Sequence, residues 1–133
     1  MRLVINRENI KTFVRKTLGC GCPEEVFGHI DCRPGVALDE KTLLRNKLAI
    51  GGRLLIYIME VSSSDALGAL IPFLVDKGSN ERDSLGFNRA RLVLVTDDID
   101  QIKKAASHIF EKTQKDEKIH LHLIHKHGIP DFL

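Results

Sequence analysis

The chain has 133 residues, of which 43% are apolar and 29% are charged, and its formal net charge is +2. These values are typical of one folded domain, and they exclude an intrinsically disordered chain. Residues 1–66 carry ten basic and eight acidic side chains and residues 67–133 carry ten of each, so no basic region favours nucleic acid and we expect no nucleic acid partner.

The first predicted elements are a short strand over residues 2–5 and an amphipathic helix over residues 7–18. Asn6 can accept a hydrogen bond from a free backbone N–H of the helix, and apolar side chains recur on one helical face. Gly19 is suited to end this helix, because it has no side chain to oppose a left-handed backbone.

The residues after this helix support two interpretations. Pro23, Glu24 and Glu25 are typical of a first helical turn, where proline fits and acidic groups face the positive end of the helix. Residues 26–32 instead alternate in the manner of a strand. We favour a strand that follows one helical turn and ends in a turn at residues 33–35.

Gly51 and Gly52 carry the strongest turn signal in the chain. Apolar runs flank the pair, and both glycines can take the positive φ that a tight hairpin requires. The following residues, 53–61, are apolar at nearly every position, which indicates a central strand covered on both faces. Residues 39–47 are polar and give no clear prediction.

A very apolar helix is predicted over residues 65–76, after the serines at 62–64, with a kink or break at Pro72. Its apolar residues, from Leu67 to Val75, occupy most of the circumference, so the helix is either deeply buried or packed on a partner. We expect a protein partner or a second copy of the chain to use this stretch. Residues 77–88 are predicted to form a long polar loop.

The second half alternates strands and helices. Strands are predicted at residues 91–96 and 118–125, with a helix over 99–115 whose start carries a capping box of Asp98 and Gln101. Strand–helix–strand units normally place their strands parallel, whereas the glycine hairpin adds an antiparallel strand. The sequence therefore predicts one α/β domain over residues 1–133, with a mixed five-stranded sheet, a β-hairpin plus βαβαβ, flanked by about three helices.

The cysteine-rich stretch after the first helix is the strongest candidate for chemistry. Thiolate and imidazole groups are preferred zinc ligands, and four of them suffice for a tetrahedral site. We predict a metal site, with zinc as its cofactor, from four residues: Cys20, Cys22, His29 and Cys32. Two histidines on one face of the last strand, His120 and His122, are weaker candidates for the same site. The alternative is that cysteines 20 and 32 are small buried apolar side chains.

The same two neighbouring cysteines also support a redox interpretation. Cys20 and Cys22 flank a single glycine, so a disulfide between them closes a small ring and is expected to be reactive and reducible. A thiol near the start of a helix has a lowered pKa, but Glu24 and Glu25 would oppose that effect at Cys22.

Acidic residues at predicted strand ends offer a third kind of site. Glu60 ends one strand, and Asp98 and Asp100 follow a later one, where carboxylates can bind Mg²⁺. This arrangement is similar to that of toprim nucleic-acid enzymes, although Val61 stands where that family has a glycine and the aspartate pair lies one residue late. The serines at 62–64 can hold an anion, but they are better explained as helix caps.

No segment is long enough to span a membrane, and the first residues are too short and too polar for a signal peptide. The odd number of cysteines argues against a disulfide framework. We therefore expect a small cytoplasmic metal- or thiol-binding protein that uses the Cys-x-Cys loop, for structural zinc or for redox or metal carriage. The alternative is a non-catalytic interaction or oligomeric scaffold module. The sequence contains no complete catalytic motif, so it does not establish whether the protein is an enzyme.

Overall fold

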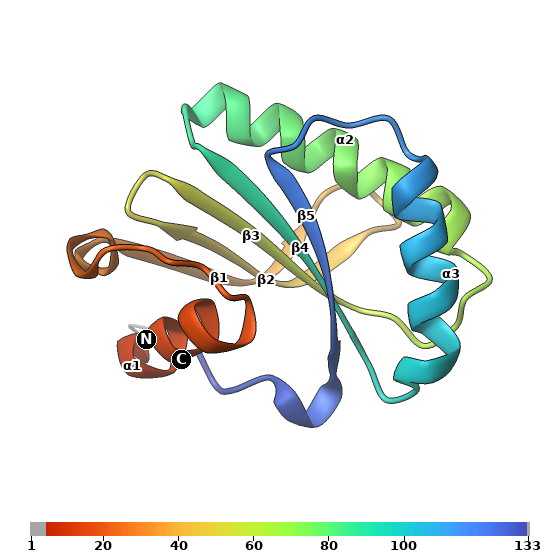
Figure 1. Ribbon diagram of the computed structural model, residues 1–133, viewed down its shortest axis with the longest axis horizontal. Helices are drawn as coiled ribbons and strands as arrows, with labels where there is room; N and C mark the ends of the chain where they lie inside the picture. The colour runs from red at the N-terminus through yellow and green to blue at the C-terminus, as the bar shows by residue number, and fades with distance from the viewer. Residues whose placement is uncertain (1–4, 133) are drawn as a thin grey trace.

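The computed structural model describes residues 5–132, so the strand predicted over residues 2–5 lies almost wholly outside the described part. One sheet of five strands has the order β1-β2-β3-β4-β5 (Figure 1). Neighbours from β1 to β3 are antiparallel, and those from β3 to β5 are parallel, which confirms the predicted mixed α/β sheet. The strands are β1 Ile30–Ala37, β2 Leu43–Ile50, β3 Leu54–Glu60, β4 Arg89–Thr96 and β5 Ile119–His125, and the helices are α1 Arg7–Thr12, α2 Leu67–Leu85 and α3 Ile99–Lys112.

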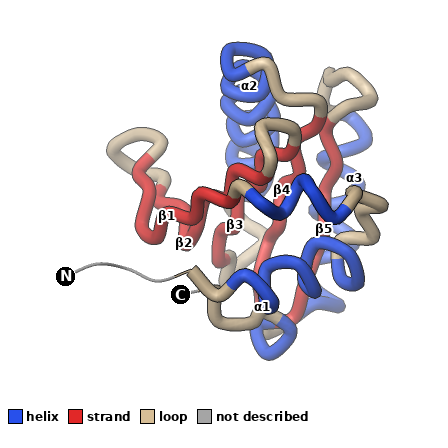
Figure 2. The backbone as a smooth tube through the Cα atoms, turned by 90° about the vertical axis from the view of Figure 1, so that its left-hand side faces the viewer, coloured by secondary structure: helices blue, strands red, loops and turns tan. Residues whose placement is uncertain are grey.

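Helices cover both faces of the sheet (Figures 1 and 2). The central strand β3 contributes apolar side chains to both faces. Leu54, Ile56 and Ile58 belong to a core shared with α1. Leu55 and Tyr57 belong to a second core shared with α2 and α3. Alternate side chains of a strand point to opposite faces, so a strand apolar at every position needs cover on both sides. The prediction of a central strand here is confirmed.

The glycine hairpin between β2 and β3 is also confirmed. Gly51 and Gly52 have φ values of +60° and +64°, as a tight turn between antiparallel strands requires. The amide of Gly51 donates a hydrogen bond of 2.7 Å to the carbonyl of His29. The turn is therefore tied to the segment that leads from the cysteine loop into β1.

The first helix begins and ends as predicted. The Asn6 side chain accepts a 3.2 Å hydrogen bond from the amide of Asn9. The helix continues as a π-helical turn over Phe13–Thr17, and Gly19 follows with φ +70°. The end of the chain packs beside it, because the Phe132 carbonyl accepts a 2.7 Å hydrogen bond from the amide of Asn6.

The predicted strand over residues 26–32 is wrong in its boundaries. Glu24–Gly28 form a short 3₁₀ helix, and β1 begins only at Ile30. The strand then passes through Pro34, where a turn was predicted. Proline is tolerated because β1 is an edge strand, whose unpaired side needs no backbone N–H. Its partner β2 begins at Leu43, within the segment that gave no clear prediction.

The predicted loop over residues 77–88 is wrong, because α2 continues to Leu85 and ends at Gly86, which has φ +73°. Polar residues there looked like a loop, but most of them lie on the exposed side of the helix. Arg82 is the exception, since it is buried in an ion pair with Asp116. The helix also passes through Pro72, which was expected to kink or split it.

The apolar stretch from Leu67 to Val75 faces the protein's own second core. Leu67, Ile71 and Leu74 are fully or almost fully buried, against the sheet and α3. This is the first of the two outcomes that the apolar helix allowed. Among the described residues, no helix combines the length and apolar character that crossing a bilayer demands.

Candidate functional site

The cysteine loop joins the end of the first helix to the 3₁₀ helix. The amide of Cys20 donates a 3.0 Å hydrogen bond to the carbonyl of Val14, which holds the loop against the last helical turn. Arg15 donates a 3.2 Å hydrogen bond to the carbonyl of Cys22. Both ends of the Cys-x-Cys unit are therefore anchored to the same helix.

Cys20 and Cys22 are joined by a disulfide, with their Cα atoms 5.5 Å apart. Both side chains are half-buried and pack against the edge of the core that contains α1. The sequence predicted that this pair could close a ring across one residue. The loop that carries both cysteines forms one wall of a pocket.

This cysteine pocket has a volume of about 210 Å³. Its other wall comes from the starts of β3 and β4, where backbone amides of residues 88 and 89 donate hydrogen bonds of 2.8 and 3.1 Å to the Arg53 carbonyl. The pocket is lined by Cys20, Gly21, Cys22, Pro23, Val26, Arg53, Leu54, Asn88 and Arg89. Two arginines thus line a small pocket together with a disulfide, and the guanidinium of Arg89 donates a 3.4 Å hydrogen bond to the carbonyl of Glu117.

A third arginine lies beneath the loop. Arg91 donates a 3.1 Å hydrogen bond to the carbonyl of Leu18 and approaches Nε2 of His122 at 2.8 Å. Its Nε atom is buried without a hydrogen-bond partner among the described residues. Burial and the nearby charge of Arg89 lower the pKa of Arg91. The last strand is therefore linked to the cysteine loop through one arginine, which the sequence alone could not show.

The charge of Glu24, which follows the cysteine pair, is balanced by basic side chains. Glu24 forms ion pairs with Lys11 and Arg15, the latter at 3.0 Å. These contacts, chiefly the hydrogen bond from Lys11, lower the pKa of Glu24. The expected opposition of Glu24 to a thiolate at Cys22 is therefore weakened, because its charge is already balanced.

The structure does not gather the predicted metal ligands. His29 is exposed, and Cys32 is a free, buried thiol on β1 that is 8% exposed and belongs to the apolar core. Burial raises the pKa of Cys32, which fits the alternative of a small apolar side chain. Across residues 5–132, no three His, Cys, Asp or Glu side chains are grouped so that they could hold a metal ion. A zinc site at this loop stays a prediction.

His120 and His122 lie side by side on the sheet face that also bears Arg91. Burial and the charge of Arg91 lower the pKa of His122 from 6.5 to about 4, and burial and Arg91 also lower that of His120. Arg91 donates to Nε2 of His122, so this ring is neutral and carries its proton on Nδ1. Neutral His122 is therefore a hydrogen-bond acceptor that orients Arg91.

We expect the folded protein to lose stability as the pH falls from 6.5 toward about 4. In this range His122 takes up a proton when the chain is unfolded but resists it when the chain is folded, so acid favours the unfolded state. Urea unfolding across this range should show a smaller loss in His122→Gln than in the wild type. His108→Gln, an exposed change on α3, is the control. Equal pH slopes in all three proteins would contradict this assignment.

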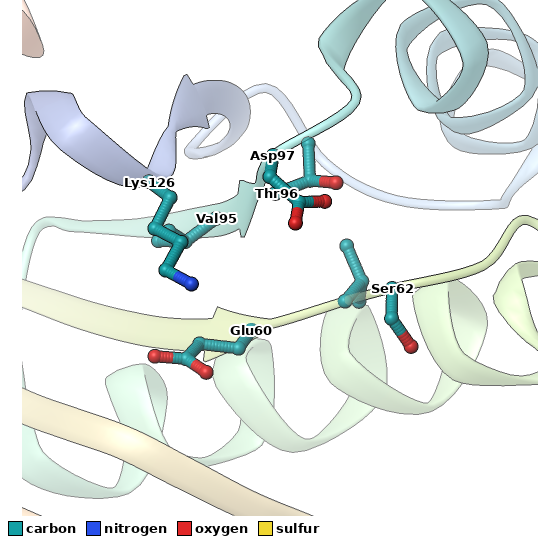
Figure 3. A pocket seen from close by; sticks show the side chains of 7 residues that line it. Glu60, Ser62, Val95, Thr96, Asp97 and Lys126 are labelled. Atoms are coloured by element: carbon teal, nitrogen blue, oxygen red, sulfur yellow. The ribbon is translucent and has the colours of Figure 1, made fainter.

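A second polar pocket lies at the opposite ends of the parallel strands (Figure 3). It measures about 330 Å³ and combines side chains from the ends of three strands. They are Glu60 and Ser62 at the end of β3, Thr96 and Asp97 at the end of β4, and Lys126 after β5. The proposed acidic site does not assemble here: Asp98 caps α3, and its side chain accepts a hydrogen bond from the Gln101 amide. Glu60 is instead paired with Arg45 at 3.1 Å.

The fold and the site together define an α/β protein with a mixed sheet and a disulfide at the rim of an arginine-lined pocket. Comparison with known protein families, with characterised proteins and with solved structures finds no match. The geometry of the site is therefore the basis for a proposed function.

Proposed function

We propose that this chain is a thiol–disulfide exchange protein in which the Cys20–Cys22 pair cycles between disulfide and dithiol. The observation that carries this proposal is the position of the disulfide, half-buried and lining an open pocket. Redox-active cysteines need access to a partner thiol, whereas buried cysteines such as Cys32 are inert.

The exchange reaction requires an external thiol. A substrate thiolate attacks one cysteine sulfur, the Sγ–Sγ bond breaks, and the other cysteine leaves as a thiolate, giving a mixed disulfide. A second substrate thiolate then attacks the substrate sulfur of that mixed disulfide and releases the first cysteine. Two substrate thiols are thereby oxidised to one disulfide, and the protein disulfide is reduced to a dithiol.

The arginine groups around the pocket favour this chemistry. Arg53 and Arg89 line it, and Arg91 supports the loop through the Leu18 carbonyl. Positive charge near a cysteine stabilises the thiolate, and a better-stabilised thiolate is a better leaving group. The arginines are thus expected to favour the step in which one cysteine leaves as a thiolate.

As a structural element alone, this disulfide would stabilise the fold only slightly. The stabilisation that a disulfide supplies by restricting the unfolded chain grows with the length of the closed loop, and for three residues it is only about 1.5 kcal/mol. A pair that closes so short a ring contributes little to folding, so its presence beside a pocket is better explained by reactivity.

The test is a thiol count and an exchange assay on the full chain. We expect oxidised protein, treated with a dithiol under native conditions, to gain two thiols that react with a maleimide. Treating the reduced protein with a low-molecular-weight disulfide before the maleimide should remove both of these thiols. Cys20→Ser and Cys22→Ser should each abolish this exchange while lowering the free energy of unfolding by only about 1.5 kcal/mol. Cys32→Ser is the matched control and should keep full exchange.

Two results would contradict the proposal. In one, the disulfide is reduced only after the protein unfolds. In the other, the reduced chain binds one equivalent of zinc that prevents reoxidation and is lost in the Cys20→Ser/Cys22→Ser protein. The second result would favour the metal-carrying function that the same loop predicts.

The interaction module stays the second candidate from sequence, but the structure gives it less support. Leu67, Ile71 and Leu74 are buried inside the protein, so a partner at residues 67–75 would meet mainly the half-buried Leu70 and Phe73. Exchange activity that depends on Cys20 and Cys22 separates the two functions.

A further inference from the structure

We infer that the pocket beside the Cys20–Cys22 disulfide selects small thiols that carry a carboxylate, with Arg53 and Arg89 binding the anionic group. This inference rests on the proposed exchange function and names its substrate class. The pocket has a volume of about 210 Å³, on the scale of a small molecule.

The arginines at this site have no carboxylate partner in the described part of the chain. Among residues 5–132, no carboxylate lies within 4.0 Å of the guanidinium nitrogens of Arg53, Arg89 or Arg91. Other basic side chains do have such partners, including Arg15, which is paired with Glu24. Arg53 and Arg89 at the pocket, and Arg91 two residues after Arg89, therefore have no carboxylate partner among these residues.

The charges of Arg89 and Arg91 lower the pKa values of neighbouring basic groups. The charge of Arg89 contributes to lowering the pKa of Arg91, and both arginines contribute to lowering that of His120. Like charges held together raise the local positive potential, and a concave site concentrates that potential on an entering ligand. An anion that binds there lowers this positive potential. Guanidinium groups bind carboxylates in a planar, two-pronged geometry.

The proposed ligand carries both an anionic group and a thiol. Cys20 and Cys22 line the same pocket as Arg53 and Arg89, so one small molecule can place a carboxylate on the arginines and its sulfur near the disulfide. Its thiolate then attacks a cysteine sulfur, and the electron pair of the broken bond stays on the other cysteine, as in the exchange reaction above. Binding holds the attacking sulfur in position, which accelerates that step.

The experiment compares three small thiols that differ in charge: 3-mercaptopropionate, 2-mercaptoethanol and cysteamine. Each reduces the oxidised full-length protein, and rates are expressed per thiolate to remove differences in thiol pKa. At low salt we expect the anionic thiol to react about tenfold faster than the neutral one, and the cationic thiol to be slowest. Raising the ionic strength from about 0.01 M to about 0.5 M should remove most of this preference.

The variant that tests the site is Arg53→Gln/Arg89→Gln. Both side chains are exposed, so the change should leave the fold intact while removing the preference for 3-mercaptopropionate. Lys103→Gln/Lys104→Gln is the matched control, because it removes the same charge from exposed positions on α3. We expect this control to keep the wild-type preference.

The outcomes distinguish the carboxylate preference from the exchange function. Equal per-thiolate rates for all three thiols, or an equal effect of both double variants, would overturn the carboxylate preference and leave the exchange function standing. Failure of every thiol to reduce the folded protein would overturn the exchange function itself.

Discussion

Gly51→Ala is expected to lower the free energy of unfolding by about 3–5 kcal/mol, whereas Gly52→Ala should cost only about 1–2 kcal/mol. Both glycines have positive φ, so an added side chain is disfavoured at either position. The two positions differ in the space available to an added Cβ atom. A Cβ atom at Gly51 would lie 2.5 Å from Cγ1 and 2.6 Å from the carbonyl oxygen of Val26, and nothing lies within 4 Å of one at Gly52.

The clash at Gly51 involves backbone, so a change of side-chain rotamer cannot relieve it. The segment around Val26 would have to move, and the 2.7 Å hydrogen bond from the Gly51 amide to the His29 carbonyl would be strained. Val26 also lines the cysteine pocket, so the same change should alter the rate of disulfide exchange. Urea unfolding of both variants is the measurement, and similar losses in the two would contradict this account.

Asp116→Asn is expected to cost about 3 kcal/mol, because it leaves the buried charge of Arg82 without its main partner. Arg82 is only 2% exposed, and it donates hydrogen bonds to both carboxylate oxygens of Asp116, one of them 2.9 Å long. That carboxylate also accepts a 2.9 Å hydrogen bond from the Lys118 amide, which fixes the turn before β5. Asparagine keeps an oxygen that can accept from the Lys118 amide, so the expected loss comes from the charge pair with Arg82.

The reverse change should be milder. In Arg82→Met the apolar side chain keeps much of the buried volume, and Asp116, with 44% of its side chain exposed, can be solvated, so we expect a loss of about 1–2 kcal/mol. Asp83→Asn is the control, since that side chain is 68% exposed and its removal should change stability by less than about 0.5 kcal/mol. Thermal or urea unfolding measures all three. A larger loss in Arg82→Met than in Asp116→Asn would contradict the argument.

Local signals in the sequence identified most of the fold. The Gly51-Gly52 turn, the Asn6 and Asp98 caps and the last strand each depend on a few adjacent residues, and all of them appear in the structure. The parallel order of β3 to β5 followed from the strand–helix–strand pattern. These features were predictable because the backbone angles and hydrogen bonds that create them are determined within one turn or one strand.

The errors arose where distant residues override local preference. Residues 77–85 look like a loop because their side chains are polar, yet they extend α2, and Arg82 is paired with a residue in the loop before β5. The start of β1 was misplaced because its pairing is set by β2, through a register such as Ile30 with Ile50. Strand registers and buried ion pairs join residues far apart in the chain, so a local pattern does not contain them.

For the site, the sequence by itself determined that Cys20 and Cys22 are the reactive candidates and that a ring between them is small. Only the tertiary structure decided what surrounds them. Arg53 and Arg89 come from the starts of two parallel strands, and Arg91 reaches the loop through the Leu18 carbonyl, 73 residues away in the chain. Covalent spacing determines which bonds a pair of cysteines can form, whereas the charge around that pair depends on sheet pairing and helix packing, which only the folded chain establishes.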